Sequence, residues 1–143
     1  MRSTASLVLL LLAGCAPESP TIDLGRVECA HCRMNVVDAR FAAALITKAG
    51  RQYSFDGPEC MLPHVAEGTI AEAQVKAWYV SDFVRPGRLI EATTAQYALG
   101  DSYRSPMRGD VAAFATAAER DSAIASSGGE PLTWDAVRQR LAE

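Results

Sequence analysis

The sequence lacks a hydrophobic run long enough to cross a bilayer, because its N-terminal apolar stretch at residues 5–13 is shorter than the about 20 residues that a membrane-spanning helix needs. It also lacks clustered positive charge, with 14 Lys and Arg against 17 Asp and Glu and a net charge of -3. Proteins that bind nucleic acid need basic residues gathered on one face, so we expect no nucleic-acid partner. Catalytic Ser/His/Asp arrangements, phosphate-cradling glycine loops and paired acid/base carboxylates are missing too. The sequence therefore predicts that the protein is not an enzyme.

The apolar stretch follows Arg2 and ends at Gly14-Cys15, which is the organisation of a secretory signal peptide. Residues 12–15, Leu-Ala-Gly-Cys, match the lipobox, in which the signal is cut before the cysteine and a diacylglycerol alkylates its sulfur. We predict a cleaved lipoprotein signal at residues 1–14, lipidation of Cys15 and a lipidated tether at residues 15–25. Several acyl chains, such as palmitate, on one residue make a stable membrane anchor. The expected location is the periplasmic face of a membrane. Ala16 follows Cys15 in place of the Asp that signals retention in the inner membrane, so we expect the outer membrane in a Gram-negative cell.

Residues 26–85 predict a first unit with the order ββαβ. Alternating and β-prone residues favour strands at 41–47 and 52–55, with Gly50 at the turn between them. Asp56 is expected to cap a short helix that has Pro58 at its first position and carries Cys60, and Pro63 limits its length. A third strand is predicted at 75–80.

Residues 86–143 predict a second unit of the same order. Strand-like segments lie at 89–94, 96–103 and 111–115, and a helix at 117–126 stops at Gly128-Gly129. A short strand at 131–134 leads to a small C-terminal helix, on which Trp134, Val137 and Leu141 share one apolar stripe. The predicted fold class is therefore α+β, made of two small ββαβ-type units.

The segment Cys29-Ala-His-Cys32-Arg-Met34 is the most informative motif, since it places three sulfur side chains and His31 close together. Thiolate, thioether and imidazole ligands favour Cu(I) over hard cations. Zinc held by Cys29, Cys32, Cys60 and a histidine is an alternative, although Met34 would then have no role because thioether is a poor zinc ligand. A Cys29–Cys32 disulfide in a structural lipoprotein and a periplasmic thiol-disulfide oxidoreductase also stay open. A c-type haem is excluded, because Arg33 follows the second cysteine where histidine is required.

The methionines and the second histidine outside this motif carry weaker signals. Met107 lies among polar and turn-forming residues with no apolar period, which indicates an exposed or site-facing thioether. Met61, on the short helix, is expected in the core. His64 is expected at the surface or as a helix cap and not as a ligand.

Several motifs together resemble those of the NosL family of copper-binding lipoproteins. The shared elements occur in order along the mature chain: Cys-x-x-Cys-x-Met followed by Asn35, Phe55-Asp56 with Glu59-Cys60-Met61, Tyr79-Val-Ser-Asp82, and Ser105-Pro-Met107. The resemblance implies Cys32, Met34 and Met107 as metal ligands, and the Cys-x-x-Cys motif itself adds Cys29 and His31 as auxiliary ligands. The chain departs from the family pattern by placing Arg108 where glycine is usual, with Gly109 one step later.

The resemblance also implies a function. Members of the family resemble metallochaperones that bind Cu(I) outside the cytoplasmic membrane. The expected protein is thus a membrane-anchored Cu(I) metallochaperone that delivers copper to an exported cuproenzyme. The expected receiving partner is nitrous oxide reductase or its maturation complex, and the expected second partner is the membrane, reached through the lipid anchor.

Overall fold

The computed structural model of the chain describes residues 19–142. The predicted signal peptide and the predicted lipidation site at Cys15 lie outside the described residues. In residues 19–142 no helix combines the length and the apolar character that a membrane span requires.

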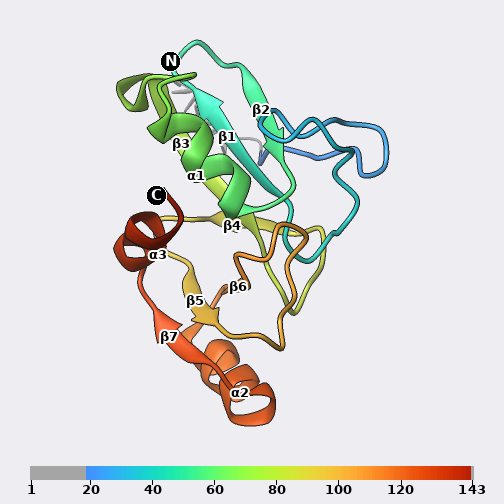
Figure 1. Ribbon diagram of the computed structural model, residues 1–143, viewed down its shortest axis with the longest axis vertical. Coiled ribbons are helices and arrows are strands. Elements are labelled where there is room, and N and C mark those ends of the chain that lie inside the picture. Colours follow the sequence, from blue (N-terminus) through green and yellow to red (C-terminus); the bar gives the residue numbers. More distant parts are fainter. Residues whose placement is uncertain (1–18, 143) are drawn as a thin grey trace, which may run out of the picture.

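The first unit is a ββαβ arrangement with one additional strand (Figure 1). Its antiparallel sheet has the strand order β2-β1-β3-β4. The elements are β1 (Ala43–Thr47), β2 (Gln52–Phe55), α1 (Pro58–Ala66), the 3-10 helix η1 (Glu72–Gln74), β3 (Val75–Ser81) and β4 (Leu89–Glu91). The predicted hairpin is confirmed, with Gly50 at a φ of 84° in the turn, a conformation that glycine adopts without a steric penalty.

The second unit repeats this topology. Its elements are β5 (Gln96–Leu99), β6 (Val111–Phe114), α2 (Ala117–Ser127) and β7 (Glu130–Leu132). The sheet order is β6-β5-β7, so the first strand of the unit is central, the second lies on one side and the strand after the helix lies on the other. The first unit places β2, β1 and β3 in the same way. The α+β fold class is therefore confirmed, and both units share one ββαβ order.

Strand β4 pairs with β3 and so extends the first sheet. A tight turn produces this pairing: Asp82 N–H donates to the Arg88 carbonyl, Arg88 N–H donates to the Arg85 carbonyl, and Gly87 has a φ of 87°. The chain thus returns directly along β3. The boundary predicted at residue 86 falls before this strand.

The C-terminal helix α3 (Trp134–Leu141) connects the two units. It contacts both α1 and β5, and Figure 1 shows it beside α1 and above the second sheet. The Trp134 ring lies 5.9 Å from the ring of Trp78 on β3 and 5.9 Å from the ring of Tyr97 on β5. Val137 is fully buried in the same core. One continuous hydrophobic core therefore spans both units.

The cap and the end of helix α1 differ from the prediction. Pro58 is its first residue, as predicted, but Gly57 precedes it as the N-cap and no side chain caps the helix. The predicted capping role of Asp56 is therefore wrong. The helix also passes through Pro63 and reaches Ala66, because a proline at this position removes only the bond to the carbonyl of Glu59.

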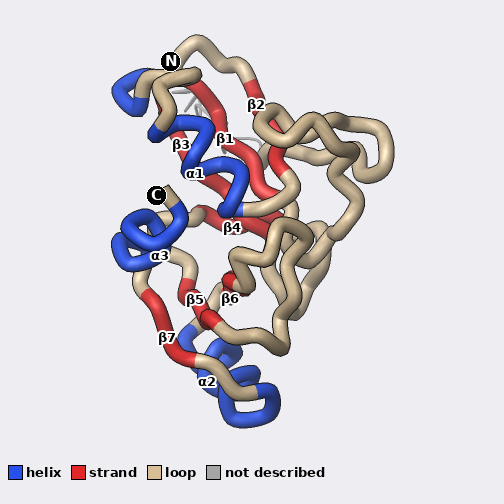
Figure 2. The backbone as a smooth tube through the Cα atoms, in the orientation of Figure 1, coloured by secondary structure: helices blue, strands red, loops and turns tan. Residues whose placement is uncertain are grey.

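The chain before β1 is loop throughout residues 19–42 (Figure 2). It begins with part of the predicted tether. Pro20 is buried, and the Gln52 side-chain amide donates to the Thr21 carbonyl at 2.6 Å. The chain from Pro20 onward is thus already held against the first sheet.

Candidate metal centre

The Cys-x-x-Cys-x-Met motif forms the tip of a small hairpin. Glu28 and Asn35 form an antiparallel bridge, Cys29 N–H donates to the Met34 carbonyl at 2.7 Å, and Arg33 N–H donates to the Cys29 carbonyl at 3.1 Å. Arg33 closes the turn with a φ of 68°, a left-handed conformation that is uncommon outside glycine. The turn brings both cysteines to the same end of the hairpin.

Contacts with two neighbouring elements fix the position of this tip. Ala30 N–H donates to the carbonyl of Ser54 on β2 at 2.9 Å, which attaches the tip to the sheet. Helix α1 follows β2 directly and carries Cys60 in its first turn. The hairpin and the helix therefore meet at the cysteines.

Cys29, Cys32 and Cys60 form a cluster of three free thiols, which we call the thiol cluster. Their Sγ atoms all lie within 4.8 Å of one another. Cys29 and Cys60 are buried, whereas Cys32 is partly exposed. The predicted alternative of a Cys29–Cys32 disulfide is not formed in this structure. Three thiols at this spacing form a donor set that could hold a soft metal ion.

Hydrogen bonding within the thiol cluster separates the proton affinities of its members. The Cys60 thiol donates a hydrogen bond to the Cys29 sulfur, and this bond lowers the pKa of Cys29 despite the opposing effect of burial. Hydrogen bonds from the backbone N–H groups of Cys32, Asp56 and His31 lower the pKa of Cys29 further. The same bond, together with burial, raises the pKa of Cys60. Burial also raises the pKa of Cys32. The first proton therefore leaves Cys29, and the other two thiols hold theirs more firmly.

Two carboxylates at the start of α1 border the thiol cluster. Burial raises the pKa of Asp56, and the negative charges of Cys29 and Glu59 raise it further. Within the described part of the chain, Asp56 Oδ1 and Glu59 Oε2 are buried without a hydrogen-bond partner. The start of α1, which presents Cys60, thus carries two acidic side chains, each with one buried oxygen that lacks a hydrogen-bond partner within residues 19–142.

The two histidines lie side by side next to the cysteines. The ring centroids of His31 and His64 are 5.8 Å apart and the rings are nearly perpendicular. His31 is partly exposed, with its Nδ1 3.9 Å from Glu67 Oε2. His64 is buried against Phe55, so the predicted surface location is wrong: it follows Cys60 by four residues on α1 and therefore shares its inward face. Burial lowers the pKa of His64, and His31 lowers it further.

The burial of Met61 and the exposure of Met107 agree with the sequence prediction, which made no statement about the exposure of Met34. Met61 is fully buried in the core, whereas Met34 is 50% exposed and Met107 is 42% exposed. Met34 lies in the hairpin of the motif. Met107 comes from the second unit, but its backbone N–H donates to Glu59 Oε1 at 3.4 Å, one residue before Cys60. The fold thus brings the Met107 loop to the helix that carries Cys60 of the thiol cluster.

Sequence reasoning missed Cys60 as a partner of the motif, except in the zinc alternative. The structure brings Cys29, Cys32 and Cys60 together with His31 nearby, and it leaves Met34 and Met107 exposed. One signal for Cys60 was available in the sequence. Three cysteines remain when Cys15 is set aside, and this odd number left one thiol without an assigned role. Its location followed only from the packing of α1 on the sheet.

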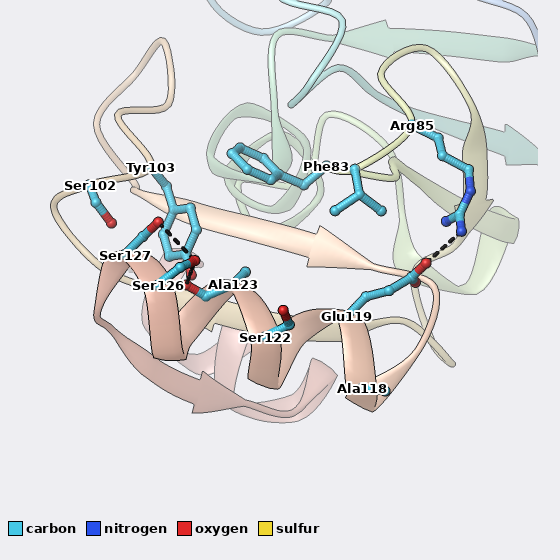
Figure 3. A pocket seen from close by; sticks show the side chains of 11 residues that line it. Phe83, Arg85, Ser102, Tyr103, Ala118, Glu119, Ser122, Ala123, Ser126 and Ser127 are labelled. Carbon is cyan, nitrogen blue, oxygen red and sulfur yellow. Dashed lines mark hydrogen bonds and ion pairs between the residues drawn. The ribbon is translucent and has the colours of Figure 1, made fainter.

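A cavity of a different kind lies between the β3–β4 connection and helix α2 (Figure 3). Its volume is about 630 Å³, and Phe83, Tyr103 and Ala123 give it an apolar lining. An ion pair between Arg85 and Glu119 closes one end. This cavity contains no thiol or imidazole, so it is not a soft-metal site.

Comparison with known proteins agrees with the geometry of the first unit. The NosL family model matches residues 23–142. The chain belongs to the NosL family. The NosL fold is also found in a solved structure, the crystal structure of the copper chaperone NosL from Shewanella denitrificans, with a TM-score of 0.69 and 22% sequence identity over 82% of this chain and 93% of that chain. No protein with a curated description matches the chain. NosL membership agrees with the prediction that the protein is not an enzyme.

Proposed function

We propose that this protein is a Cu(I) metallochaperone that carries copper as cargo on the thiol cluster. The observation that supports this most strongly is the convergence of three free thiols from two separate segments, with Sγ atoms within 4.8 Å of one another. Thiolates select soft ions, and Cu(I) accepts a low coordination number. The copper chaperone NosL from Shewanella denitrificans, whose fold this chain shares, also supports the proposal.

The surroundings of the thiol cluster favour copper over zinc. Structural zinc sites are closed tetrahedral sets of four protein ligands. Here Cys32 is partly exposed and two exposed thioethers, Met34 and Met107, lie on the segments that border the cluster. Thioethers are ligands of Cu(I) and not of zinc. We therefore propose Cys29, Cys32 and Cys60 as the thiol ligands, with Met34, Met107 and His31 as additional donors.

The exposure gradient suggests how copper is passed on. Cys29 and Cys60 hold the ion from the buried side, whereas Cys32 and Met34 form the exposed side. A donor from the receiving protein enters on the exposed side and displaces these ligands first. Ligand exchange of this kind keeps the ion bound throughout, so free copper is not released.

The location and the receiving partner complete the proposal. The lipobox at Cys15 supports a lipid anchor and a position at the periplasmic face of a membrane, and the outer membrane is proposed for a Gram-negative cell. The resemblance to the NosL family supports nitrous oxide reductase or its maturation complex as the copper-receiving protein.

A Cys15→Ser variant should lose membrane association in cell fractionation while its copper affinity stays unchanged. Membrane association equal to that of the wild type would contradict the anchor.

Anaerobic competition of the purified protein with a Cu(I) chelator tests the copper site. We expect one Cu(I) per chain, with a large loss of affinity in Cys32→Ser and a smaller loss in Met34→Ala. Met61→Leu is the matched control, since Met61 is buried in the core away from solvent. Wild-type affinity in both site variants would overturn the proposed ligand set.

Two further measurements separate copper transport from the alternatives. A structural zinc ion contributes to folding, so a zinc-stabilised lipoprotein would melt at a lower temperature in EDTA. We expect no change in the melting temperature. A thiol-disulfide oxidoreductase would exchange its Cys29/Cys32 pair with glutathione, and we expect no rapid exchange. The raised pKa of Cys32 keeps this thiol protonated, and the lowered pKa of Cys29 makes its thiolate a weaker nucleophile.

A further inference from the structure

The loop at residues 104–110, which carries Met107, has an unusually strained backbone. Three of its residues, Arg104, Arg108 and Asp110, have φ values of 50°, 60° and 52°. Left-handed conformations are unfavourable for residues with a side chain, and a segment keeps several of them only where its surroundings impose them. The loop is therefore held in place by contacts that can be identified.

The first contact is internal to the loop. Ser105 N–H donates to Asp110 Oδ1 at 3.1 Å, and Asp110 N–H donates to Ser105 Oγ at 2.8 Å. Both residues are buried, and Arg108 donates three hydrogen bonds to the Asp110 carboxylate from outside. This reciprocal pair, which we call the Ser105–Asp110 clamp, closes the loop and leaves Met107 at its exposed tip.

The second contact attaches the loop to α1. Met107 N–H donates to Glu59 Oε1, and Gly109 lies directly against the same side chain. A Cβ added at Gly109 would lie 2.9 Å from Glu59 Cβ and 3.3 Å from a Leu141 methyl group, so only glycine allows this approach. The family pattern usually has glycine at position 108, whereas this chain has it at 109. The residue without a side chain thus lies where the loop meets the helix.

We infer that Glu59 is a positioning residue that holds the Met107 loop on the first turn of α1 and so presents the Met107 thioether to Cu(I) at Cys60. The Ser105–Asp110 clamp gives the loop the shape that this contact requires. The inference rests on the proposed copper site and adds to it a way in which the second unit supplies a ligand. When the loop is displaced, copper loses one ligand. The apparent affinity for copper therefore decreases as the fraction of molecules with the loop in place decreases.

Selenium-edge X-ray absorption of the selenomethionine-labelled full chain, loaded with one Cu(I), tests this inference. In a Met34→Leu background we expect a copper neighbour of selenium from Met107, and we expect Met107→Leu to remove it. Glu59→Ala should weaken this signal strongly and lower the Cu(I) affinity about tenfold. Thiolate ligation, measured at the copper edge, should persist.

Glu59→Gln is the decisive control, because its amide oxygen still accepts the Met107 N–H while the charge is removed. We expect it to restore both the selenium signal and the affinity. If Glu59→Gln behaves like Glu59→Ala, then Glu59 acts through its charge and the positioning role is wrong. Ser105→Ala provides a second route, which leaves α1 untouched and should also weaken the selenium signal.

The outcomes distinguish the inference from the proposed function. If the wild-type chain binds no Cu(I), the proposed function fails. If it binds Cu(I) through the cysteines but Glu59→Ala and Ser105→Ala keep the full selenium signal, only the positioning role of Glu59 and of the clamp is overturned.

Discussion

The two halves of the molecule share one topology but use their helices in opposite ways. In both, a helix connects the second strand to the third, and the sheet orders β2-β1-β3 and β6-β5-β7 correspond. Helix α1 is deeply embedded, with six buried residues, whereas α2 has none. Packing therefore holds α1 without a side-chain cap, while α2 depends on the Thr116 cap.

This difference decides where the chemistry lies. The third residue of α1 is Cys60, which faces the hairpin, and the third residue of α2 is Glu119, which pairs with Arg85 at the surface. An embedded helix can deliver a thiol to a defined point, because its side chains are fixed by their neighbours. The surface helix α2 instead borders the cavity lined by Phe83 and Tyr103. The shared topology thus gives the first half an embedded helix that carries a thiol and the second half a surface helix that carries none.

Removal of the thiol from the embedded helix should have the largest effect. We expect Cys60→Ser to lower the Cu(I) affinity about a thousandfold, more than the 10–100-fold typical of residues that only support a ligand. Glu119→Gln, at the corresponding position of α2, should leave the affinity unchanged. Anaerobic chelator competition measures both. Equal affinities in the two variants would remove Cys60 from the site.

Truncation of the two helices should separate their contributions to stability. Leu62→Ala removes a buried side chain of α1 and should lower the free energy of unfolding by about 3 kcal/mol. Ile124→Ala, in the partly exposed α2, should cost about 1 kcal/mol. Urea denaturation of the metal-free protein compares them. Similar losses would show that α2 is embedded as deeply as α1.

The pH dependence of copper binding should distinguish the thiols from the thioether. Cu(I) must displace the protons of Cys32 and Cys60, whose pKa values are raised, whereas the pKa of Cys29 is lowered and its proton is already lost. Binding therefore releases protons, and the affinity should fall as the pH falls, by about tenfold per pH unit for each proton released.

Two variants attribute that slope to the residues. Cys60→Ser should flatten it, because one titrating ligand is gone. Met107→Leu should lower the affinity by the same factor at every pH, because a thioether carries no proton. Chelator competition between about pH 6 and pH 8 covers the relevant range. An affinity independent of pH in the wild type would argue against thiolate ligation.

Loss of the cap on α2 should have the smallest effect. Thr116 Oγ1 accepts the Glu119 N–H at 3.2 Å, so Thr116→Ala should lower the free energy of unfolding by about 1 kcal/mol. Ser122→Ala, on the exposed surface of the same helix, serves as the control and should change it little. If the two variants unfold alike, packing and not capping holds α2.

Local sequence signals predicted most elements of this fold. The hairpin around Gly50, the start of α1 at Pro58 and the stop of α2 at Gly128 all follow from residues close in sequence. The pairing of β4 with β3 did not follow, because strand propensity does not specify a partner. The tight turn at Gly87 became informative only once its hydrogen bonds were known.

The site was less predictable because it depends on tertiary contacts. The motif from Cys29 to Met34 is visible in sequence, but the approach of Cys60 requires α1 to pack on the sheet. The burial of His64 follows from the same packing. The left-handed backbone at Arg104 and Arg108 carries no glycine signal at either position, so the shape of the Met107 loop could not be predicted.

Helix α3 makes the packing around Cys60 depend on the last element of the chain. It follows every other element in sequence, yet α1 packs against it, and it covers the rings of Trp78 and Tyr97. A chain that ends at β7 already contains all of its cysteines, but the helix that carries Cys60 still lacks one of the elements that it packs against. The thiol cluster thus gains its final support only when α3 docks, so the end of the chain secures a cluster built from residues in its first half.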